Sequence, residues 1–478
     1  MNSIIDRYID SHQQPFCALA DHIWDLAELK FAEHQSCETH ARTLEQAGFR
    51  VQRNLGGLPT AMLAEYGSGE PIIALLGEYD ALPGLSQVAG LPQAKPVEHQ
   101  GAGHGCGHNL LGCASLLAAI AVKQAMVEGK LEGTLRYYGC PAEEGGSGKT
   151  FLVRAGAFDG VDAALTWHPD SFNGVSTFKN LANLQAYFRF QGRASHAAIS
   201  PHLGRSALDA VELMNVGSNY LREHMPADTR LHYAITNSGG HSPSIVQHHA
   251  EVLYLLRGSE MNGVLDLFER VKNVAAGAAL MTETQMSVQF DRATSSVLGN
   301  FTLENLLQEC LEEVGGAQPD ENDELQARRF RETFSDEDIT SAYTDLGLVR
   351  DDSVLHQGVV PLAKQRTSIF ASSDVGDVSR VVPTAQLYMA CYAIGTAFHS
   401  WQMVAQGKSN FAHKGMLQTA KVLANAAYTL LTDRERVAAA RQEFSQLIIK
   451  TPYRCPLPED IMPPINHQKS AQPSDLKQ

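Results

Sequence analysis

The sequence lacks paired cysteines. Its eight cysteines are scattered along 478 residues and none forms a CxxC pair. A structural zinc site commonly draws on two such pairs, and a disulfide-stabilised secreted domain concentrates its cysteines in a short chain. The spacing therefore argues against both, and we expect reduced thiols and a cytoplasmic protein.

The sequence also lacks the usual marks of a secreted or membrane protein. Residues 1–15 carry acidic side chains early and have no apolar core of the kind that a secretory signal needs. The longest nearly apolar run, residues 110–122, is 13 residues long, whereas a helix needs about 20 to span a bilayer. This run suits a buried helix better.

Positive charge is in short supply. The chain has 38 Lys and Arg against 53 Asp and Glu, a formal net charge of −15. This balance argues against a general affinity for nucleic acid or for anionic membranes, although a local pocket can still bind a small anion. The composition is otherwise ordinary, with 44% hydrophobic residues, and the length allows two or three domains.

Helical and strand-like patterns alternate through the first part of the chain. Residues 21–47 are predicted to form a helix that ends at Gly48, and residues 109–126 a buried helix. Four short apolar runs are typical of strands: residues 60–67, 71–80, 133–139 and 162–168. Alternation of this kind predicts an α/β domain with a mainly parallel sheet. Functional sites in such sheets form at the carboxyl ends of the strands.

The pattern changes near residue 181. Strand, helix, strand, helix and strand follow at residues 183–196, 204–225, 244–258, 261–281 and 285–292. We expect a four-stranded, ferredoxin-like α+β unit with its helices on one face. Because apolar strand patterns return at residues 385–395, this unit is predicted to be an insertion. The predicted boundaries are catalytic domain 1–180, inserted domain 181–293, catalytic domain 294–466 and flexible tail 467–478.

The stretch GAGHGCGHNLLG, residues 101–112, is the first candidate for chemistry. Cys106 and His108 lie two residues apart. They could be a nucleophile with its base, part of a structural zinc site or part of a catalytic metal site. A structural zinc site is disfavoured because no second cysteine pair exists, but the spacing alone leaves a cysteine nucleophile open.

Further metal-ligand side chains stand at predicted strand ends. Glu143 and Glu144 lie in PAEEGG, His168 lies in TWHPD, and His399 follows an apolar strand in GTAFHSWQ. With Cys106 and His108, this set is sufficient for two divalent ions with one carboxylate left over. A hydrolytic metal site needs that surplus, because a free carboxylate must move the proton of the attacking water. A lone buried histidine or an exposed Glu-Glu pair is commonly structural, so the prediction rests on their recurrence at strand ends.

These motifs together resemble the M20 family of metallopeptidases and amidohydrolases, in the branch that uses a metal-binding cysteine. GEYDALPG (77–84), CGH (106–108), PAEEG (141–145) and two later histidines occur in the family's order. The resemblance runs from about Trp24 to about residue 430. It implies a dinuclear metallohydrolase, using Zn²⁺ or Mn²⁺, whose catalytic domain is interrupted by a lid or dimerisation domain.

The resemblance also implies roles for individual residues. Glu143 would act as general base and then as acid, and Asp80 would orient a ligand. His196 would reach the active site of a neighbouring subunit and stabilise the oxyanion. Arg257 would bind a substrate carboxylate, and Ser244 stands where relatives usually have an asparagine that touches substrate. The implied ligands of two metal ions are Cys106, His108, Glu144, His168 and His399.

The reaction that the resemblance implies is hydrolysis of an amide that joins an aromatic acyl group to glutamate, as in folate breakdown. The alternatives are hydrolysis of other aminoacyl conjugates or dipeptides, and a chain that is active mainly with a partner. We expect a homodimer or a hetero-oligomer with a related chain. Neither nucleic acid nor membrane is expected as a partner. We also expect Cys106 to bind metal as a thiolate, a form that its position at the amino end of the following helix favours.

Overall fold

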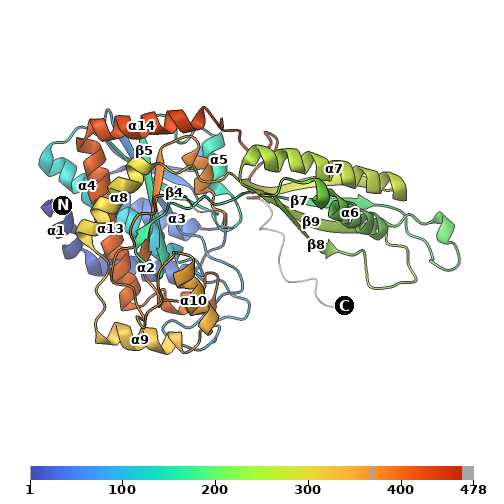
Figure 1. The fold of residues 1–478 in the computed structure, drawn as a ribbon, viewed down its shortest axis with the longest axis horizontal. Coiled ribbons are helices and arrows are strands. Elements are labelled where there is room, and N and C mark those ends of the chain that lie inside the picture. The colour runs from blue at the N-terminus through green and yellow to red at the C-terminus, as the bar shows by residue number, and fades with distance from the viewer. Residues whose placement is uncertain (1, 367–370, 466–478) are drawn as a thin grey trace.

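The residues on either side of the predicted insertion 181–293, called the catalytic part below after the predicted domain, are built on one mixed sheet (Figure 1). The computed structural model describes residues 2–366 and 371–465. Seven strands lie in the order β1-β2-β4-β3-β5-β11-β6. Their bounds are β1 (Arg50–Arg53), β2 (Met62–Ser68), β3 (Ile72–Glu78), β4 (Gly133–Cys140), β5 (Ala163–Asp170), β6 (Gly174–Val175) and β11 (Thr384–Ala390).

The centre of this sheet is parallel and its edges are antiparallel. Strands β4, β3, β5 and β11 run parallel to one another, whereas β1, β2 and β6 pair antiparallel. The parallel strands are nearly continuous apolar runs because both of their faces are covered. On β3, Ile73 and Leu75 face one hydrophobic cluster, and Ala74 and Leu76 face the other. The predicted α/β sheet is confirmed, with antiparallel strands added at both edges.

Helices cover both faces of the sheet. The long helices α4 and α13 pack in the larger cluster, and α5 and α11 contribute to the cluster on the opposite face. The helices of this part are α1 (Ser3–Ser11), α2 (Gln13–Leu26), α3 (His34–Gln46), α4 (His108–Gly129), α5 (Gly148–Arg154), α8 (Phe301–Val314), α9 (Glu321–Arg331), α10 (Asp336–Thr344), α11 (Val375–Ser379), α12 (Trp401–Gln406), α13 (Asn410–Thr432) and α14 (Arg434–Ile448).

The single helix predicted over residues 21–47 is wrong. Helix α2 ends at Leu26, where Ala27 adopts a left-handed conformation with φ of 40°. Helix α3 begins at His34, and the Glu28 carboxylate accepts hydrogen bonds from backbone amides in the first turn of this helix. Because the carboxylate satisfies these amides, the chain breaks into two helices.

Helix α4 is a core helix. Among the described residues it is the one helix long and apolar enough to span a membrane, and 83% of its apolar window is buried inside the protein. Burial on all sides explains why its sequence shows no polar face. The polar stretch 316–340 contains α9 and the start of α10, and each of these helices begins with a capping box.

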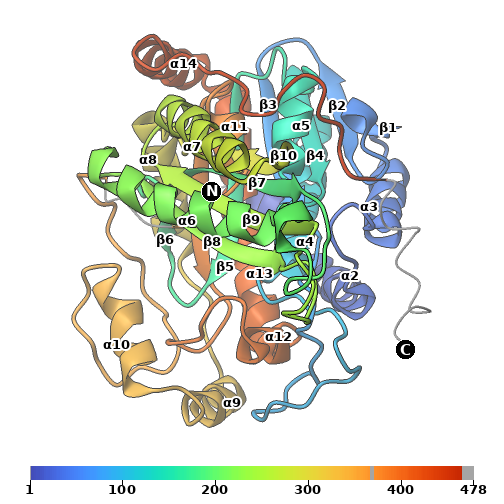
Figure 2. The ribbon, with the colours of Figure 1, turned by 90° about the vertical axis from the view of Figure 1, so that its right-hand side faces the viewer.

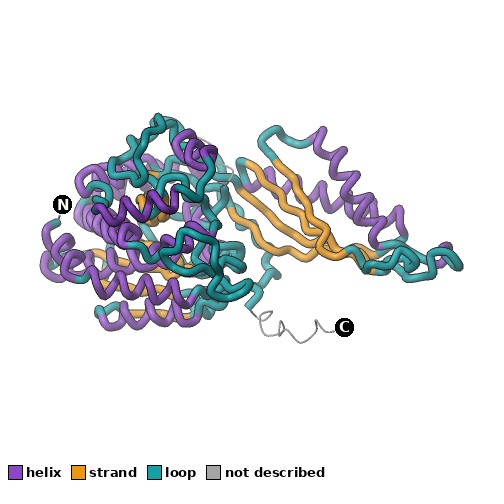
Figure 3. The backbone as a smooth tube through the Cα atoms, turned by 90° about the horizontal axis from the view of Figure 1, so that it is seen from below, coloured by secondary structure: helices purple, strands orange, loops and turns teal. Residues whose placement is uncertain are grey.

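The inserted unit, called the lid below, projects from the catalytic part (Figures 1 and 3). Its four strands lie in the order β10-β7-β9-β8 and are all antiparallel. Helices α6 and α7 lie side by side over one face of the sheet (Figure 2). The elements are β7 (Ala182–Gln191), α6 (Ala207–Leu221), β8 (Arg230–Asn237), β9 (His249–Gly258), α7 (Met261–Thr282) and β10 (Gln285–Thr294).

The lid has the predicted four strands with helices on one face, but one strand was not identified from the sequence. Three of its strands coincide with predicted ones, whereas β8 lies within a segment that the pattern left unassigned. On β8 the only buried residue is Leu231. The strand lies at the edge of the sheet, so it has no alternation of apolar and polar side chains to detect. The tail predicted over residues 467–478 lies outside the described residues.

Candidate active site

The predicted ligands meet at one edge of the catalytic sheet. His168 lies near the end of β5, and the loop that carries Glu143 and Glu144 follows β4. Cys106 and His108 lie at the start of α4, and His399 lies between β11 and α12. Since the parallel strands end at the same edge, residues far apart in sequence are brought together there.

One group of ligand atoms comes from Cys106, His108 and His168, and these atoms all lie within 4.8 Å of one another. The Cys106 Sγ atom lies 3.3 Å from His168 Nε2. His168 Nδ1 lies 2.9 Å from the Pro169 carbonyl oxygen, to which it can donate. With its proton on Nδ1, the His168 ring presents the lone pair of Nε2 to the other two ligand atoms of this group.

A second group comes from Cys106, Glu144 and His399, again within 4.8 Å. His399 Nε2 lies 3.3 Å from a Glu144 carboxylate oxygen. The His399 backbone has a φ of 58°, and its amide donates to the Gly105 carbonyl oxygen at 2.8 Å. This hydrogen bond holds the loop that contains His399 against the loop that contains Cys106. Cys106 belongs to both groups, so its sulfur could help to hold either of two ions.

The chemistry of these side chains fits two divalent cations. His108 Nε2 and Glu144 Oε1 are buried and have no hydrogen-bond partner within the described part of the chain. A buried polar atom without a partner costs free energy, and a cation would satisfy both atoms. One thiol, three imidazoles and one carboxylate suit Zn²⁺ and Mn²⁺, which accept sulfur, nitrogen and oxygen ligands to different degrees.

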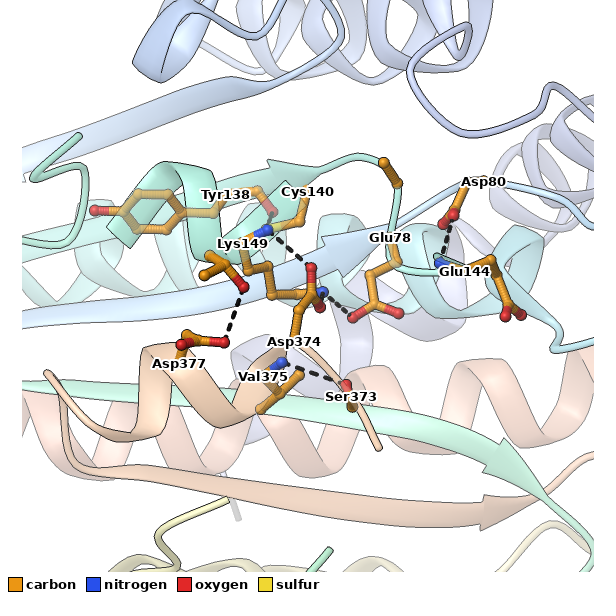
Figure 4. A network of polar contacts seen from close by, with 12 residues as sticks. Glu78, Asp80, Tyr138, Cys140, Glu144, Lys149, Ser373, Asp374, Val375 and Asp377 are labelled. Atoms are coloured by element: carbon orange, nitrogen blue, oxygen red, sulfur yellow. Dashed lines mark hydrogen bonds and ion pairs between the residues drawn. The ribbon is translucent and has the colours of Figure 1, made fainter. Parts of the chain in front are cut away.

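Asp80 connects the two groups. Its Oδ1 atom lies 2.9 Å from His108 Nδ1. Its Oδ2 atom accepts a hydrogen bond from the Glu144 backbone amide at 2.8 Å (Figure 4). A histidine ligand usually donates its second ring N–H to a carboxylate, which fixes the ring and its tautomer. The position of Asp80 allows it to do this for His108.

Burial and negative charge act strongly on Cys106. Burial first, and then the Glu144 carboxylate, raise the pKa of the thiol well above its usual value. Without a bound cation these surroundings therefore favour the neutral thiol. Helix α4 starts only at His108, and its positive end is outweighed by burial and by nearby carboxylates. A cation is needed to stabilise the thiolate.

Glu143 lies beside the ligands without belonging to either of the two groups. It forms a third group with Glu78 and His108, also within 4.8 Å. Burial first, and then the carboxylates of Glu78 and Glu144, raise the pKa of Glu143 well above its usual value. Cations bound beside it would favour the ionised carboxylate, which is the form that a general base needs.

A buried ionic network behind the site has no counterpart among the sequence-based predictions (Figure 4). Lys149 Nζ lies 2.6 Å from a carboxylate oxygen of Glu78 and 2.6 Å from one of Asp374. Lys149 and Asp374 are fully buried, and Glu78 is 2% exposed. The other Glu78 oxygen lies 3.3 Å from His108 Nε2. Glu78 stands two residues before Asp80, which was the available signal, but nothing in the sequence paired it with Lys149.

The lid residues fall into two places. His196 and Ser244 lie together at the far end, where the Ala197 amide donates to the Ser244 carbonyl oxygen. They are separated from the catalytic part by the length of β7, about 30 Å for ten extended residues. Arg257, at the end of β9, lies at the near end. The structure thus keeps His196 and Ser244 away from the metal ligands of their own chain.

Two further histidines have packing partners. His104 is buried, and its Nε2 atom lies 3.0 Å from the Ile23 carbonyl oxygen. His413 Nε2 lies 2.9 Å from an Asp21 carboxylate oxygen. Neither residue belongs to a ligand group among the described residues.

The chain matches known proteins over nearly its whole length. It is 48% identical over 470 residues to a subunit of p-aminobenzoyl-glutamate hydrolase from Escherichia coli K12, covering 96% of this chain and 98% of the relative. The aminobenzoyl-glutamate utilization protein of Klebsiella pneumoniae has the same fold, with a TM-score of 0.60 and 17% identity over 89% of this chain and 98% of the other. A dinuclear metal-binding M20 peptidase from Bacillus subtilis also shares it, with a TM-score of 0.56 and 18% identity over 88% and 99%.

The model of peptidase family M20/M25/M40 matches residues 74–448. This range includes every metal-ligand candidate described above. The resemblance inferred from the motifs is therefore confirmed by comparison of whole chains. The protein belongs to peptidase family M20/M25/M40 and is a metallohydrolase that acts on amide bonds.

Proposed function

We propose that the protein hydrolyses p-aminobenzoyl-glutamate, a product of folate breakdown, to p-aminobenzoate and glutamate. The observation that carries this proposal is the 48% identity to the E. coli hydrolase chain over almost the full length of both proteins. The cluster centred on Cys106 supports it, because it offers the side chains that a dinuclear amidohydrolase requires. Fold alone would not select a substrate.

Two divalent ions, Mn²⁺ or Zn²⁺, are the proposed cofactors. Cys106 would help to hold both ions, His108 and His168 would belong to one set of ligands, and Glu144 and His399 to the other. When bound, such ions polarise the amide carbonyl and lower the pKa of water. Asp80 would hold His108 in the tautomer that presents Nε2. Support for this arrangement comes from the shared position of Cys106 in both ligand groups.

Glu143 is the proposed general base. Its carboxylate would take a proton from the attacking water and then give that proton to the nitrogen of the leaving glutamate. It lies within 4.8 Å of Glu78 and His108 but outside the two ligand groups that contain Cys106, which leaves its carboxylate available for this transfer. Proton transfer by a positioned carboxylate commonly contributes about 10²- to 10⁴-fold to the rate.

A second protein chain is part of the proposal. His196 would donate a hydrogen bond to the oxyanion in the neighbouring chain's site, since it lies at the far end of its own lid. The edge strand β8 is a suitable contact surface, because it ends the lid sheet and exposes Tyr233 and Ile235. Exposed edge strands readily pair with another chain. The partner would be a second copy or a related chain, since the E. coli relative is named as one subunit of its enzyme.

Substrate binding is assigned to Arg257 and Ser244. A guanidinium matches a carboxylate with two parallel hydrogen bonds, and the substrate's glutamate supplies one next to the scissile amide. Arg257 would bind that carboxylate, and Ser244, beside His196, would touch the substrate from the partner's lid. We also propose a cytoplasmic location, where the eight cysteines, all free thiols, would stay reduced.

The direct test is release of p-aminobenzoate from p-aminobenzoyl-glutamate by the purified full-length chain. It is measured with added Mn²⁺, with added Zn²⁺ and with a chelator. Release that needs the metal supports the proposal. A metal-loaded chain that releases no p-aminobenzoate, either alone or after addition of a related partner chain, would contradict the assigned substrate.

A further inference from the structure

A β-bulge changes the direction of one arginine in the lid. The register between β10 and β7 shifts between Phe290 and Arg292. On a regular strand, Asp291 and Arg292 would point to opposite faces. Here both contact Gln185: its amide donates to Asp291 at 2.9 Å, and Arg292 Nη2 lies 3.5 Å from its oxygen. Bulges next to active sites commonly redirect side chains in this way.

The redirected Arg292 shares a sheet face with Arg257. Arg257 is paired with Asn183 on β7, and Arg292 is paired with Gln185 on the same strand. Residues two apart on a strand point to the same face, so both arginines lie opposite the helices α6 and α7. Burial first, and then the Arg292 cation, lower the pKa of Arg257. The two guanidinium groups are therefore electrostatic neighbours.

Arg292 also reaches the loop of the candidate base. Its Nη1 atom lies 2.6 Å from the place that a β-carbon on Gly145 would occupy, and Lys30 Nζ lies 3.5 Å from the same place. Lys30 Nζ also donates to the Gly145 carbonyl oxygen at 2.9 Å. Gly145 directly follows Glu144. Two cations, one from the lid and one from the loop between α2 and α3, thus adjoin the Glu143–Gly145 turn.

This arrangement of charges is suited to an anion. Three cationic side chains, Lys30, Arg257 and Arg292, gather here near the lid carboxylate of Asp291. The Arg292 Nε atom is buried and has no hydrogen-bond partner among the described residues. A buried donor of this kind costs free energy until it is paired. A carboxylate would accept from it and offset the repulsion between the cations.

We propose that Arg292, supported by Lys30, binds the side-chain carboxylate of the substrate's glutamate. The inference rests on the proposed function, in which Arg257 takes the carboxylate next to the scissile amide. Arg292 then binds the remaining carboxylate of the substrate, the one on the glutamate side chain. This contact would make the enzyme selective for acyl-amino acids with an acidic side chain over those with a neutral side chain of the same size.

The test compares p-aminobenzoyl-glutamate with p-aminobenzoyl-glutamine on the metal-loaded full chain. The glutamine conjugate keeps the shape and loses one charge. We expect the wild type to favour the glutamate conjugate in kcat/KM by on the order of 10- to 100-fold, the range for hydrogen bonds to a charged group. Arg292→Met should remove most of this preference, because it should raise KM for the glutamate conjugate. The kcat/KM for the glutamine conjugate should change little. Arg292→Lys should retain part of it.

Arg189→Met is the matched control. Arg189 lies on β7 on the same face of the lid sheet and forms an ion pair with Glu251, so the variant removes the same charge farther from the catalytic loop. It should leave the preference unchanged. Lys30→Met should reduce the preference, since Lys30 supports the same position from the catalytic part.

The outcomes separate the two levels of the proposal. If the wild type cleaves neither conjugate, the proposed substrate is wrong. If it cleaves both equally well, or if Arg292→Met slows both by the same factor, the reaction stands and the role of Arg292 is overturned. A loss of preference in Arg189→Met equal to that in Arg292→Met would also overturn it, because general charge would then explain the effect.

Discussion

Asp80 Oδ1 lies 2.9 Å from Nδ1 of the candidate metal ligand His108, the ring nitrogen that faces away from the ligand group. The other Asp80 oxygen accepts the amide hydrogen of Glu144. A single carboxylate therefore holds one residue from each of the two ligand groups. We infer that loss of Asp80 would disturb both groups at once.

Replacement of Asp80 tests this inference. Asp80→Asn can no longer accept equally on both oxygens, and changes of this kind commonly weaken metal binding by about 10- to 100-fold. Titration of the metal-free protein with Zn²⁺ should show weaker binding of both ions. Asp170→Asn is the control, because Asp170 is a buried carboxyl at the end of β5 that belongs to no ligand group among the described residues. Equal weakening of metal binding in Asp80→Asn and Asp170→Asn would contradict the role assigned to Asp80.

Glu143→Gln separates catalysis from metal binding. The amide cannot act as a base, so we expect turnover to fall by about 10²- to 10⁴-fold. Because Glu143 lies outside the two groups that contain Cys106, both ions should still bind. The measurement is the initial rate on p-aminobenzoyl-glutamate together with the metal content of the same sample. A variant that keeps its turnover would remove Glu143 from the mechanism.

Lys149 is expected to be important for stability. Although burial opposes it, the neighbouring Asp374 and Glu78 carboxylates hold the pKa of Lys149 well above its usual value. Lys149→Met would leave both carboxylates buried without their cation, which typically costs about 3–5 kcal/mol. Urea denaturation should measure this loss in the free energy of unfolding.

The control for that experiment is Lys421→Met. Lys421 is paired with Asp10, whose side chain is half-exposed, and such surface pairs contribute at most about 1 kcal/mol. Addition of Asp374→Asn to Lys149→Met should recover part of the stability, because it removes one of the unpaired charges. If Lys149→Met and Lys421→Met lower the free energy of unfolding by the same small amount, the buried network does not stabilise the fold.

His40 should make the protein sensitive to acid. It is fully buried beside Tyr137, and burial lowers its pKa to about 3. In the unfolded chain it takes up a proton near its ordinary pKa of about 6.5. As the pH falls from about 6.5 toward 3, the unfolded state therefore gains a proton that the folded state does not, and the fold loses about 1.4 kcal/mol per pH unit.

His40→Gln should reduce this slope in the free energy of unfolding, whatever its effect at neutral pH. The comparison is made by denaturation at several pH values within the window of about 3 to 6.5 over which His40 acts. His12→Gln serves as the control, since His12 lies at the end of α1 and is only partly buried. An unchanged slope in His40→Gln would show that His40 does not couple folding to protons.

Those features that depend on local pattern could be predicted from the sequence. Apolar runs such as β3 and β5 identified the parallel centre of the sheet, and the rule for strand ends predicted that Glu144, His168 and His399 would lie at one edge of it. The failures have physical causes. The break at Ala27 depends on capping by Glu28, the edge strand β8 has no alternating burial, and the pairing of Lys149 with Asp374 crosses 225 residues of sequence.

The lid shows the same limit. Arg257 could be identified through resemblance, yet Arg292 could not be identified as its neighbour, because strand alternation predicts a different direction for that side chain. Only the bulge opposite Gln185 turns Arg292 toward Gly145. Irregular backbone of this kind depends on strand pairing, which a single sequence does not reveal.

The most direct test of the central claim is a metal titration of the metal-free chain followed by its rate on p-aminobenzoyl-glutamate. The account predicts that release of p-aminobenzoate rises with added Mn²⁺ or Zn²⁺ and reaches its plateau when two ions are bound per chain. Cys106→Ala should bind the ions more weakly and stay inactive at that ratio. Full activity of the metal-free chain, or of Cys106→Ala with two equivalents, would contradict a dinuclear site that Cys106 helps to hold.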